Sequence, residues 1–123
     1  IDPAQYRGQA VLVVGGGDSA LEAAIALAQE PGTEVILSYR SEAFSRVKQK
    51  NRTQLEERRA AGRLKVLLKS SVKRIHERDV ELEFEGAVRR VRNDAVIVCA
   101  GGLLPTPLLQ QVGIRFDTKF GKS

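Results

Sequence analysis

Six consecutive residues carry the clearest chemical signal in this sequence: Gly15, Gly16, Gly17, Asp18, Ser19 and Ala20. They follow an apolar, β-type run at residues 10–14 and precede an Ala-rich, helix-forming run at residues 20–28. A Gly-x-Gly-x-x-Ala turn between a strand and a helix is typical of a dinucleotide-binding fingerprint, in which N–H groups at the start of the helix hold a pyrophosphate. We therefore expect a nucleotide at this turn; the alternative is a structural turn without a ligand.

The residue types within this turn have separate roles. Gly15 permits a tight turn, Gly17 leaves room for a pyrophosphate to approach the backbone, and Ala20 is small enough for the helix to pack on the strand. Asp18 suits a helix N-terminus but would repel a phosphate that it faced. We expect the Asp18 side chain to point away from the pyrophosphate.

The end of the next strand, at residues 34–39, predicts which nucleotide is preferred. An NAD site usually places Asp or Glu about twenty residues after the glycines, where the carboxylate binds the adenosine ribose. Tyr39 and Arg40 occupy that place here, and Arg46 follows. Because an arginine pairs with a 2′-phosphate but cannot accept a ribose hydrogen bond, these residues favour NADP over NAD. The alternative is that Arg40 and Arg46 are solvated surface charges.

The elements that position these residues alternate between strand and helix. A charged helix is expected at residues 50–61, closed by Gly62 and offering only Leu55 and alanines as an apolar stripe, and a further strand at residues 64–68. Three short runs with partial period-two alternation then predict an antiparallel meander at residues 72–77, 80–84 and 88–92. A continuous apolar run at residues 95–100 is typical of a buried parallel strand.

The predicted fold class is therefore α/β: a Rossmann-like parallel sheet flanked by helices, with an antiparallel three-stranded β-meander as a crossover. The final apolar run ends in Gly101 and Gly102, a second flexible turn at the edge of the sheet where ligands bind in such folds. Residues 105–111 predict a short helix, because Pro105 lies near its start.

Composition and charge limit the classes of function. The chain has 123 residues, 42% of them hydrophobic, and a formal net charge of +5, which indicates one globular domain. Twelve Lys/Arg and three Glu lie between Arg40 and Arg74. This stretch could attract a phosphate-bearing cofactor or an acidic partner, or be simply a solvated face. Nucleic acid is not expected, because aromatic residues do not alternate with the basic ones. No stretch reaches membrane-spanning length.

Catalytic and metal-binding residues are not predicted. His76 is the single histidine and stands in a charged strand, so we expect a solvated surface residue. Cys99 is the single cysteine and ends an apolar run, so we expect a small core residue. One histidine and one cysteine do not make a metal site, and a lone cysteine fits a reducing cytoplasm.

Three segments together resemble the nicotinamide-nucleotide-binding domain of thioredoxin reductase-like flavoproteins, two-domain enzymes of the pyridine nucleotide-disulfide oxidoreductase superfamily. Residues 13–20 resemble the family's V-x-G-G-G-(D/N)-(S/T)-A, residues 39–46 its H-R-R-x-x-x-R, and residues 96–105 its final apolar strand followed by glycine and x-x-P. The resemblance covers residues 9–114. It implies that NADP(H) binds this domain and gives a hydride to an FAD held by a second domain, with Ala100, Gly101 and Gly102 near the nicotinamide half.

The resemblance also implies a domain division. Residues 1–9 are expected to be a linker from a preceding domain, residues 10–114 the NAD(P)H-binding domain, and residues 115–123 the start of the return to the FAD domain. The family's C-x-x-C is absent from residues 6–9, so disulfide reduction is not expected. Ferredoxin–NADP reductases of the thioredoxin reductase-like type are a better comparison. Tyr39 replaces the first arginine of the NADPH motif, and the final arginine is shifted to Arg46.

Two further interpretations remain open at this point. One is a regulatory module that senses NAD(P) and performs no chemistry. The other is a docking module, in which the basic stretch from Arg40 to Arg74 binds an acidic electron-transfer protein. The sequence leaves open whether this chain is by itself catalytic.

Overall fold

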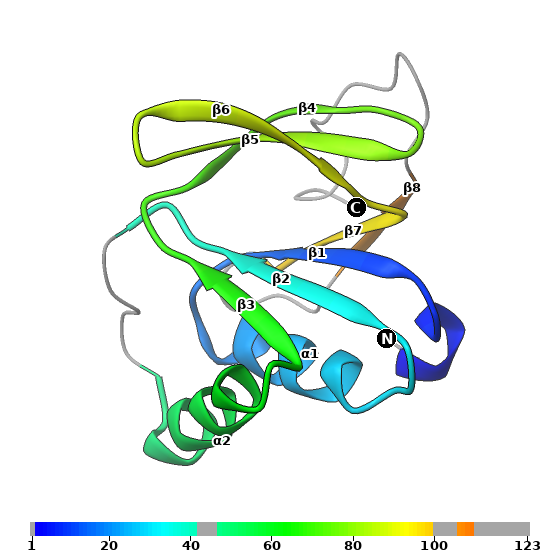
Figure 1. Ribbon diagram of the computed structural model, residues 1–123. Helices are drawn as coiled ribbons and strands as arrows, with labels where there is room; N and C mark the ends of the chain where they lie inside the picture. The colour runs from blue at the N-terminus through cyan, green and yellow to red at the C-terminus, as the bar shows by residue number, and fades with distance from the viewer. Residues whose placement is uncertain (1, 42–46, 100–105, 110–123) are drawn as a thin grey trace.

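A computed structural model describes residues 2–41 and 47–99, together with the backbone of residues 106–109. The molecule has three layers (Figure 1): two helices, a five-stranded sheet and a three-stranded sheet. The α/β class, with a parallel sheet, helices and an antiparallel meander, is confirmed. Within the described residues, no helix is long and apolar enough to span a membrane.

The five-stranded sheet forms the middle layer. Its spatial order is β3 (Leu64–Leu67), β2 (Glu34–Ser38), β1 (Ala10–Val14), β7 (Ala95–Val98) and β8 (Thr106–Leu109). The first four strands are parallel, and Val13 on β1 pairs with Leu37 on β2 and with Ile97 on β7. Because β1 and β7 are covered on both faces, their sequences are continuously apolar rather than alternating.

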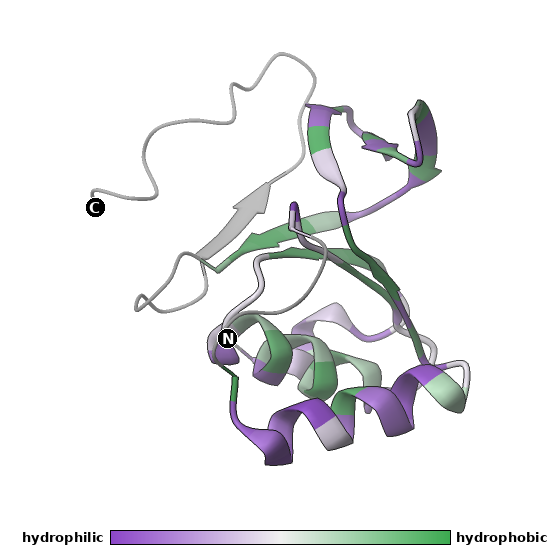
Figure 2. Ribbon diagram, turned by 90° about the vertical axis from the view of Figure 1, so that its left-hand side faces the viewer, coloured by the Kyte–Doolittle hydropathy of each residue, from purple (hydrophilic) through white to green (hydrophobic). Residues whose placement is uncertain are grey.

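Two helices cover one face of this sheet. Helix α1 (Asp18–Ala28) is Ala-rich and buries seven of its eleven residues, and helix α2 (Gln49–Ala60) lies outside it and is strongly polar (Figure 2). A short 3-10 helix, η1 (Pro3–Tyr6), precedes β1. The expected apolar stripe of α2 is correct only in part: Leu55 is buried, but Ala60 and Ala61 are exposed. Gly62, with a φ of +77°, ends the helix as expected for a left-handed C-terminal glycine.

The meander covers the other face. It comprises β4 (Ser71–Ile75), β5 (Asp79–Phe84) and β6 (Ala87–Arg92), paired antiparallel in that order. Alternate residues of β5 point inward, so that Val80 and Leu82 pack with Leu12 and Val96 of the middle sheet. The pairing of β4 with β5 contains an irregularity between Val72 and Arg74.

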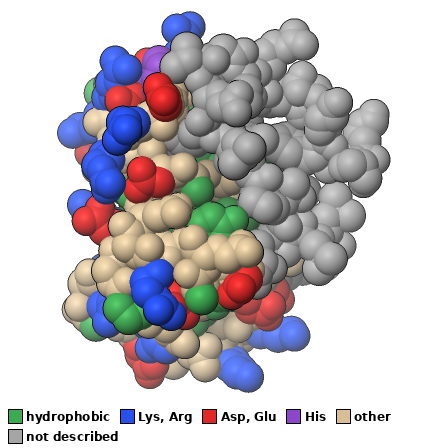
Figure 3. Space-filling view, turned by 90° about the vertical axis from the view of Figure 1, so that its right-hand side faces the viewer, with side chains coloured by type: hydrophobic (Ala, Val, Ile, Leu, Met, Phe, Trp, Pro, Cys, Tyr) green, Lys and Arg blue, Asp and Glu red, His purple; other side chains and the backbone are tan. Residues whose placement is uncertain are grey.

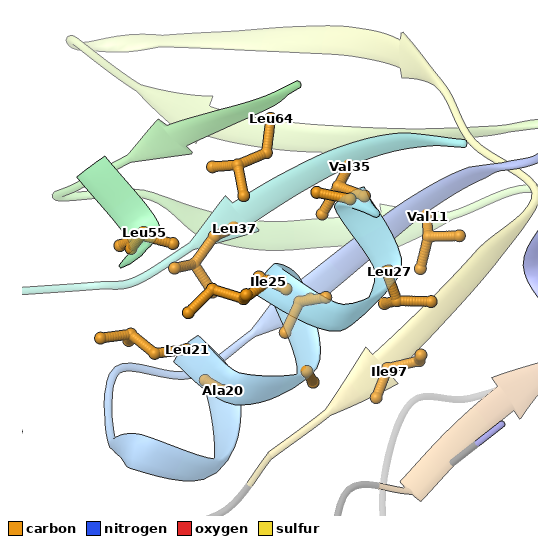
Figure 4. Packing of buried hydrophobic residues seen from close by; sticks show 14 of the residues in the cluster. Val11, Ala20, Leu21, Ile25, Leu27, Val35, Leu37, Leu55, Leu64 and Ile97 are labelled. Atoms are coloured by element: carbon orange, nitrogen blue, oxygen red, sulfur yellow. The ribbon is translucent and has the colours of Figure 1, made fainter. Parts of the chain in front are cut away.

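The larger core lies between the sheet and the helices. Figure 4 shows side chains of α1 and α2, such as Leu21, Leu27 and Leu55, facing Leu37 and Ile97 of the strands. Each of these five residues is completely buried. At about 1.5–3 kcal/mol per buried leucine or isoleucine, this layer is a main source of stability and holds the start of α1 in place.

The helix expected at residues 105–111 is wrong. Residues 106–109 form β8, which runs antiparallel to β7, with Pro107 opposite Ile97. A proline fits the first turn of a helix, but it also fits an edge strand. In an edge strand its missing N–H can face away from the neighbouring strand. The pairing with β7 therefore outweighs the local preference.

Candidate functional site

The glycine turn lies where the parallel strands end. The Gly15 N–H donates to the Ser38 carbonyl at 3.0 Å, and the Cys99 N–H donates to the Val14 carbonyl at 2.9 Å, so the pairing continues past the strand ends. These bonds bring the glycine turn between the ends of β2 and β7. The carboxyl edge of a parallel sheet, beside the start of a helix, is the usual ligand position in α/β folds.

Gly15 is required by the fold itself. Its φ is +145°, and a Cβ at this position would lie 2.6 Å from the Cys99 carbonyl oxygen and 3.2 Å from the Cβ of Ala20. Ala20 is completely buried. Gly15 and Ala20 therefore allow α1 to approach the strand ends closely, which is the role that the sequence predicts for these two residues.

Within the described residues, no contact requires a glycine at position 17. Gly17 is the N-cap residue of α1, with an ordinary extended conformation at φ −94° and ψ −173°. Among the described residues, no atom lies within 4 Å of a Cβ placed on it. Its position offers no side-chain cap to the helix, so the space before the first turn of α1 stays open to a group that binds backbone N–H donors.

Gly16 makes room for a neighbouring side chain. A Cβ on Gly16 would collide with ring atoms of Tyr39, so the ring of Tyr39 packs directly against this glycine. Gly16 is buried and Tyr39 is half-buried. The contact places Tyr39 over the glycine turn, at the end of β2, and the sequence motif gives no indication of it.

Asp18 is bound to the start of α2. Its Oδ1 accepts hydrogen bonds from the Lys48 N–H at 2.9 Å and from the Asn51 amide at 2.8 Å. The backbone bond from Lys48, followed by the bond from Asn51, lowers the pKa of Asp18 below its usual value, so the carboxylate is charged at neutral pH. The carboxylate is thus occupied by hydrogen bonds from the start of α2. Ser19 lies half-buried in the first turn of α1.

A buried pair of serines supports the end of β2. The Ser38 and Ser70 hydroxyls are 2.6 Å apart, and the Ser70 hydroxyl donates to the Leu67 carbonyl at 2.7 Å. The Ser70 N–H donates to the Tyr39 carbonyl at 3.0 Å. Sequence reasoning missed these serines, because a serine at a strand end is common and its partner lies 32 residues away.

Of the remaining predicted residues, the structure describes only Arg40. Arg40 is exposed directly after Tyr39, at the carboxyl end of β2. Arg46 and the segment Ala100, Gly101 and Gly102 lie outside the described residues. The glycine turn, Tyr39 and Arg40 are therefore the predicted site residues that the structure brings together.

Cys99 and His76 have structural environments. Cys99 is 7% exposed, and burial raises the pKa of its thiol to about 11, as expected for a core residue. His76 differs from the expectation of a solvated residue: it is half-buried, and its Nε2 lies 2.6 Å from Glu81 Oε2. Antiparallel pairing of β4 and β5 brings the two side chains together. In the described part of the chain, no three His, Cys, Asp or Glu residues form a metal-binding group.

The charges on the described surface are mixed in sign, and one hollow lies away from the predicted site residues. On the face seen in Figure 3, Lys and Arg side chains are interspersed with Asp and Glu. In the meander, opposite charges form ion pairs, such as Lys73–Glu83 and Arg90–Asp79. A hollow of about 660 Å³ lies at the opposite end of the strands, lined by residues such as Thr33 and Asn93. It contains none of the predicted site residues.

A family model described as pyridine nucleotide-disulphide oxidoreductase matches residues 1–121. The chain therefore belongs to the pyridine nucleotide-disulphide oxidoreductase family, and the resemblance inferred from its motifs is confirmed. A ferredoxin–NADP reductase from Flavobacterium johnsoniae is 32% identical over 116 residues, which are 91% of this chain and 32% of that protein.

The chain is also similar to solved structures of reductases. A thioredoxin reductase from Streptococcus pyogenes is 31% identical, with a TM-score of 0.66 over 81% of this chain and 33% of the other. A bacillithiol disulfide reductase from Staphylococcus aureus is 25% identical, with a TM-score of 0.77 over 81% of this chain and 31% of the other. The chain thus spans about a third of the length of these relatives.

Proposed function

We propose that this chain is the NADP(H)-binding domain of a flavin-dependent oxidoreductase. Its glycine turn holds the pyrophosphate at the start of α1, and Arg40 binds the 2′-phosphate at the end of β2. Membership of the pyridine nucleotide-disulphide oxidoreductase family supports the use of a nicotinamide nucleotide. The relative named a ferredoxin–NADP reductase supports NADP as the nucleotide.

The observation that carries this proposal is the open space at Gly17. Gly15 and Gly16 are explained by contacts within the protein, but the described residues contain nothing that excludes a side chain at Gly17. Serine, asparagine or aspartate would cap the helix better than glycine at this position. A glycine that no described contact requires, in front of the N-terminus of α1, fits a bound anion that needs the space.

The nucleotide and the protein divide the chemistry. When bound, NADPH supplies a hydride, which a flavin accepts in enzymes of this class. This chain's own residues bind and orient: N–H groups at the start of α1 hold the pyrophosphate, and the Arg40 guanidinium pairs with the 2′-phosphate. Residues 1–9 and 115–123 connect, in this proposal, to a part of a longer protein that binds FAD. No group of this chain needs to transfer a proton.

The test compares stability with binding in the variant Gly17→Ser. Serine keeps the backbone conformation of Gly17 and caps α1, so the midpoint of thermal unfolding should stay the same or rise. Its side chain fills the space left for the pyrophosphate, so the Kd for NADPH, measured by calorimetry, should rise about tenfold or more, as expected for losing one charge-assisted hydrogen bond. Unchanged NADPH binding in this variant would contradict the proposal.

The matched control is Gly62→Ser, the same substitution at the end of α2. Gly62 also has open space around its Cβ position, but its φ is +77°, which disfavours serine. This variant should lose about 1 kcal/mol of stability and keep the Kd for NADPH, the opposite pattern to Gly17→Ser.

A further inference from the structure

The connection between β3 and β4, residues 68–70, is attached to the residues that follow β2. The last residues of β2 and β3, Ser38 and Leu67, pair with each other, so the two parallel strands end at the same edge of the sheet (Figure 1). The Tyr39 N–H donates to the Leu67 carbonyl at 3.0 Å, and the Ser70 N–H donates to the Tyr39 carbonyl at 3.0 Å. The chain after β3 therefore stays beside the chain after β2.

A buried hydroxyl anchors this connection. Ser70 is only 3% exposed, and its hydroxyl lies 2.6 Å from that of Ser38 and donates to the Leu67 carbonyl at 2.7 Å. Because a buried hydroxyl costs free energy unless it is paired, these bonds oppose any displacement of the connection. The backbone of Lys69, the residue before Ser70, is thereby fixed in place.

Lys69 lies beside the residue that follows Arg40. The Lys69 N–H donates to the Ser41 carbonyl at 2.9 Å, and Ser41 comes directly after Arg40, to which we assign the 2′-phosphate. Lys69 and Arg40 are both exposed. Two cationic residues that are far apart in the sequence thus lie on adjacent chain segments, at the edge of the sheet where the nucleotide is proposed to bind.

The backbone of Lys69 has a conformation that is uncommon for lysine. Its φ is +53°, in the left-handed region that glycine adopts without steric cost. Glu85 has a similar φ of +56°, but it lies in the two-residue turn between β5 and β6, where such values are usual. Lys69 is not in a hairpin, because β3 and β4 belong to different sheets. Glycine would suit this backbone better, so the lysine side chain is the feature that points to a function.

We propose that Lys69 is a second cation of the 2′-phosphate site and helps to select NADPH over NADH. The inference rests on the proposed binding of NADP(H), with Arg40 at the 2′-phosphate. The flexible four-carbon stem of lysine allows its ammonium group, from a backbone fixed beside Ser41, to reach a phosphate that Arg40 binds. The phosphate then accepts hydrogen bonds from both cations. NADH has a neutral hydroxyl at the same place, so Lys69 distinguishes the two nucleotides.

The variant Lys69→Gln tests this role, because it keeps a long polar side chain and removes the charge. The Kd for NADPH, measured by calorimetry at physiological ionic strength, should rise about tenfold, as expected for losing one charge-assisted hydrogen bond, while the Kd for NADH changes less than about twofold. Lys69→Arg, which keeps the charge, should keep the preference for NADPH. An unchanged preference in Lys69→Gln, or equal losses for both nucleotides, would overturn the inference.

The matched control is Lys65→Gln, the same substitution at an exposed lysine of β3. Lys65 pairs with Ile36 and lines the hollow at the opposite end of the strands. Exposed charges separated by more than the Debye length of about 8 Å are largely screened at this ionic strength, so the ratio of the two Kd values should not change. A loss of NADPH preference equal to that in Lys69→Gln would assign the effect to general charge and count against Lys69.

The variant Lys69→Gly separates binding from folding. Glycine adopts a φ of +53° without strain, so the midpoint of thermal unfolding should stay the same or rise, while the preference for NADPH should fall as in Lys69→Gln. A glycine variant that keeps the preference would show that the lysine side chain has no role. If the unchanged protein binds neither nucleotide, the proposed function fails as well. If it prefers NADPH and both variants keep that preference, only the role of Lys69 fails.

Discussion

At the scale of single residues, each of the three glycines of the turn has a different environment. Gly15 accommodates the Cys99 carbonyl, Gly16 accommodates the Tyr39 ring, and Gly17 leaves open space at the start of α1. Consecutive glycines in a motif can therefore have different structural roles. Each glycine has its own neighbour, and the neighbours can be tested one at a time.

The contact between Gly16 and Tyr39 predicts a dependence between the two residues. Gly16→Ala should destabilise the protein by about 1–3 kcal/mol, because the new methyl group forces the Tyr39 ring out of its position. In a Tyr39→Ser background the same substitution should cost at least about 1 kcal/mol less, because the ring is gone. Urea unfolding of the four proteins gives this coupling energy.

The same pair of backgrounds provides a control with Gly17→Ala. The described residues leave space for a methyl group there, so its cost should be equal with and without the Tyr39 ring. Additive effects for Gly16→Ala as well would show that the ring does not pack on Gly16 in solution.

At the scale of elements, the meander is held to the sheet by one face of β5. Leu82 is completely buried against the middle sheet, whereas Val88 on β6 is 55% exposed. Leu82→Ala should cost about 2–5 kcal/mol, because it leaves a cavity between the two sheets. Val88→Thr, which keeps the β-branch, should change the free energy of unfolding by less than about 0.5 kcal/mol. Equal costs would mean that the meander does not dock as described.

Elements whose local preference and tertiary environment agree were predictable from the sequence. The Ala-rich run of α1 and the apolar runs of β1 and β7 favour by themselves the structures that their burial requires. Strand β8 was not predictable, because Pro107 and its neighbours have no strong preference until β7 offers a pairing partner. The meander was predicted with boundaries shifted by one to two residues, as hairpin turns allow.

The candidate site divides in the same way. The turn at residues 15–20 and the basic end of β2 were found because their spacing along the chain is local. Asn51 and Ser70 were missed, because their importance comes from partners 30 or more residues away. An asparagine within a charged helix has no signature in sequence until the fold shows that it is buried.

At the scale of the whole molecule, the single cysteine reports on unfolding. With a pKa of about 11, Cys99 carries roughly two orders of magnitude less thiolate at pH 8 than an ordinary cysteine of pKa about 8.5. Alkylation by iodoacetamide should therefore be at least about a hundredfold slower in the native protein than in urea. Thiolate populates as pH rises, so the native rate should increase towards pH 11. Equal rates in both states at pH 8 would contradict the burial of Cys99.

The family shows the class of protein to which the three layers belong, and the chain spans about a third of its relatives. The proposed function requires that this part of the protein binds a nucleotide. The structure places the glycine turn and the exposed Arg40 at the same edge of the sheet.

The most direct measurement is calorimetric titration of this chain with NADPH and with NADH, repeated with Arg40→Ala. We expect NADPH to bind more tightly than NADH, and its affinity to fall about ten- to a hundredfold when Arg40 is replaced, with little change for NADH. Absence of binding by both nucleotides, or equal losses for both in Arg40→Ala, would contradict the assignment of Arg40 and the glycine turn to NADP(H).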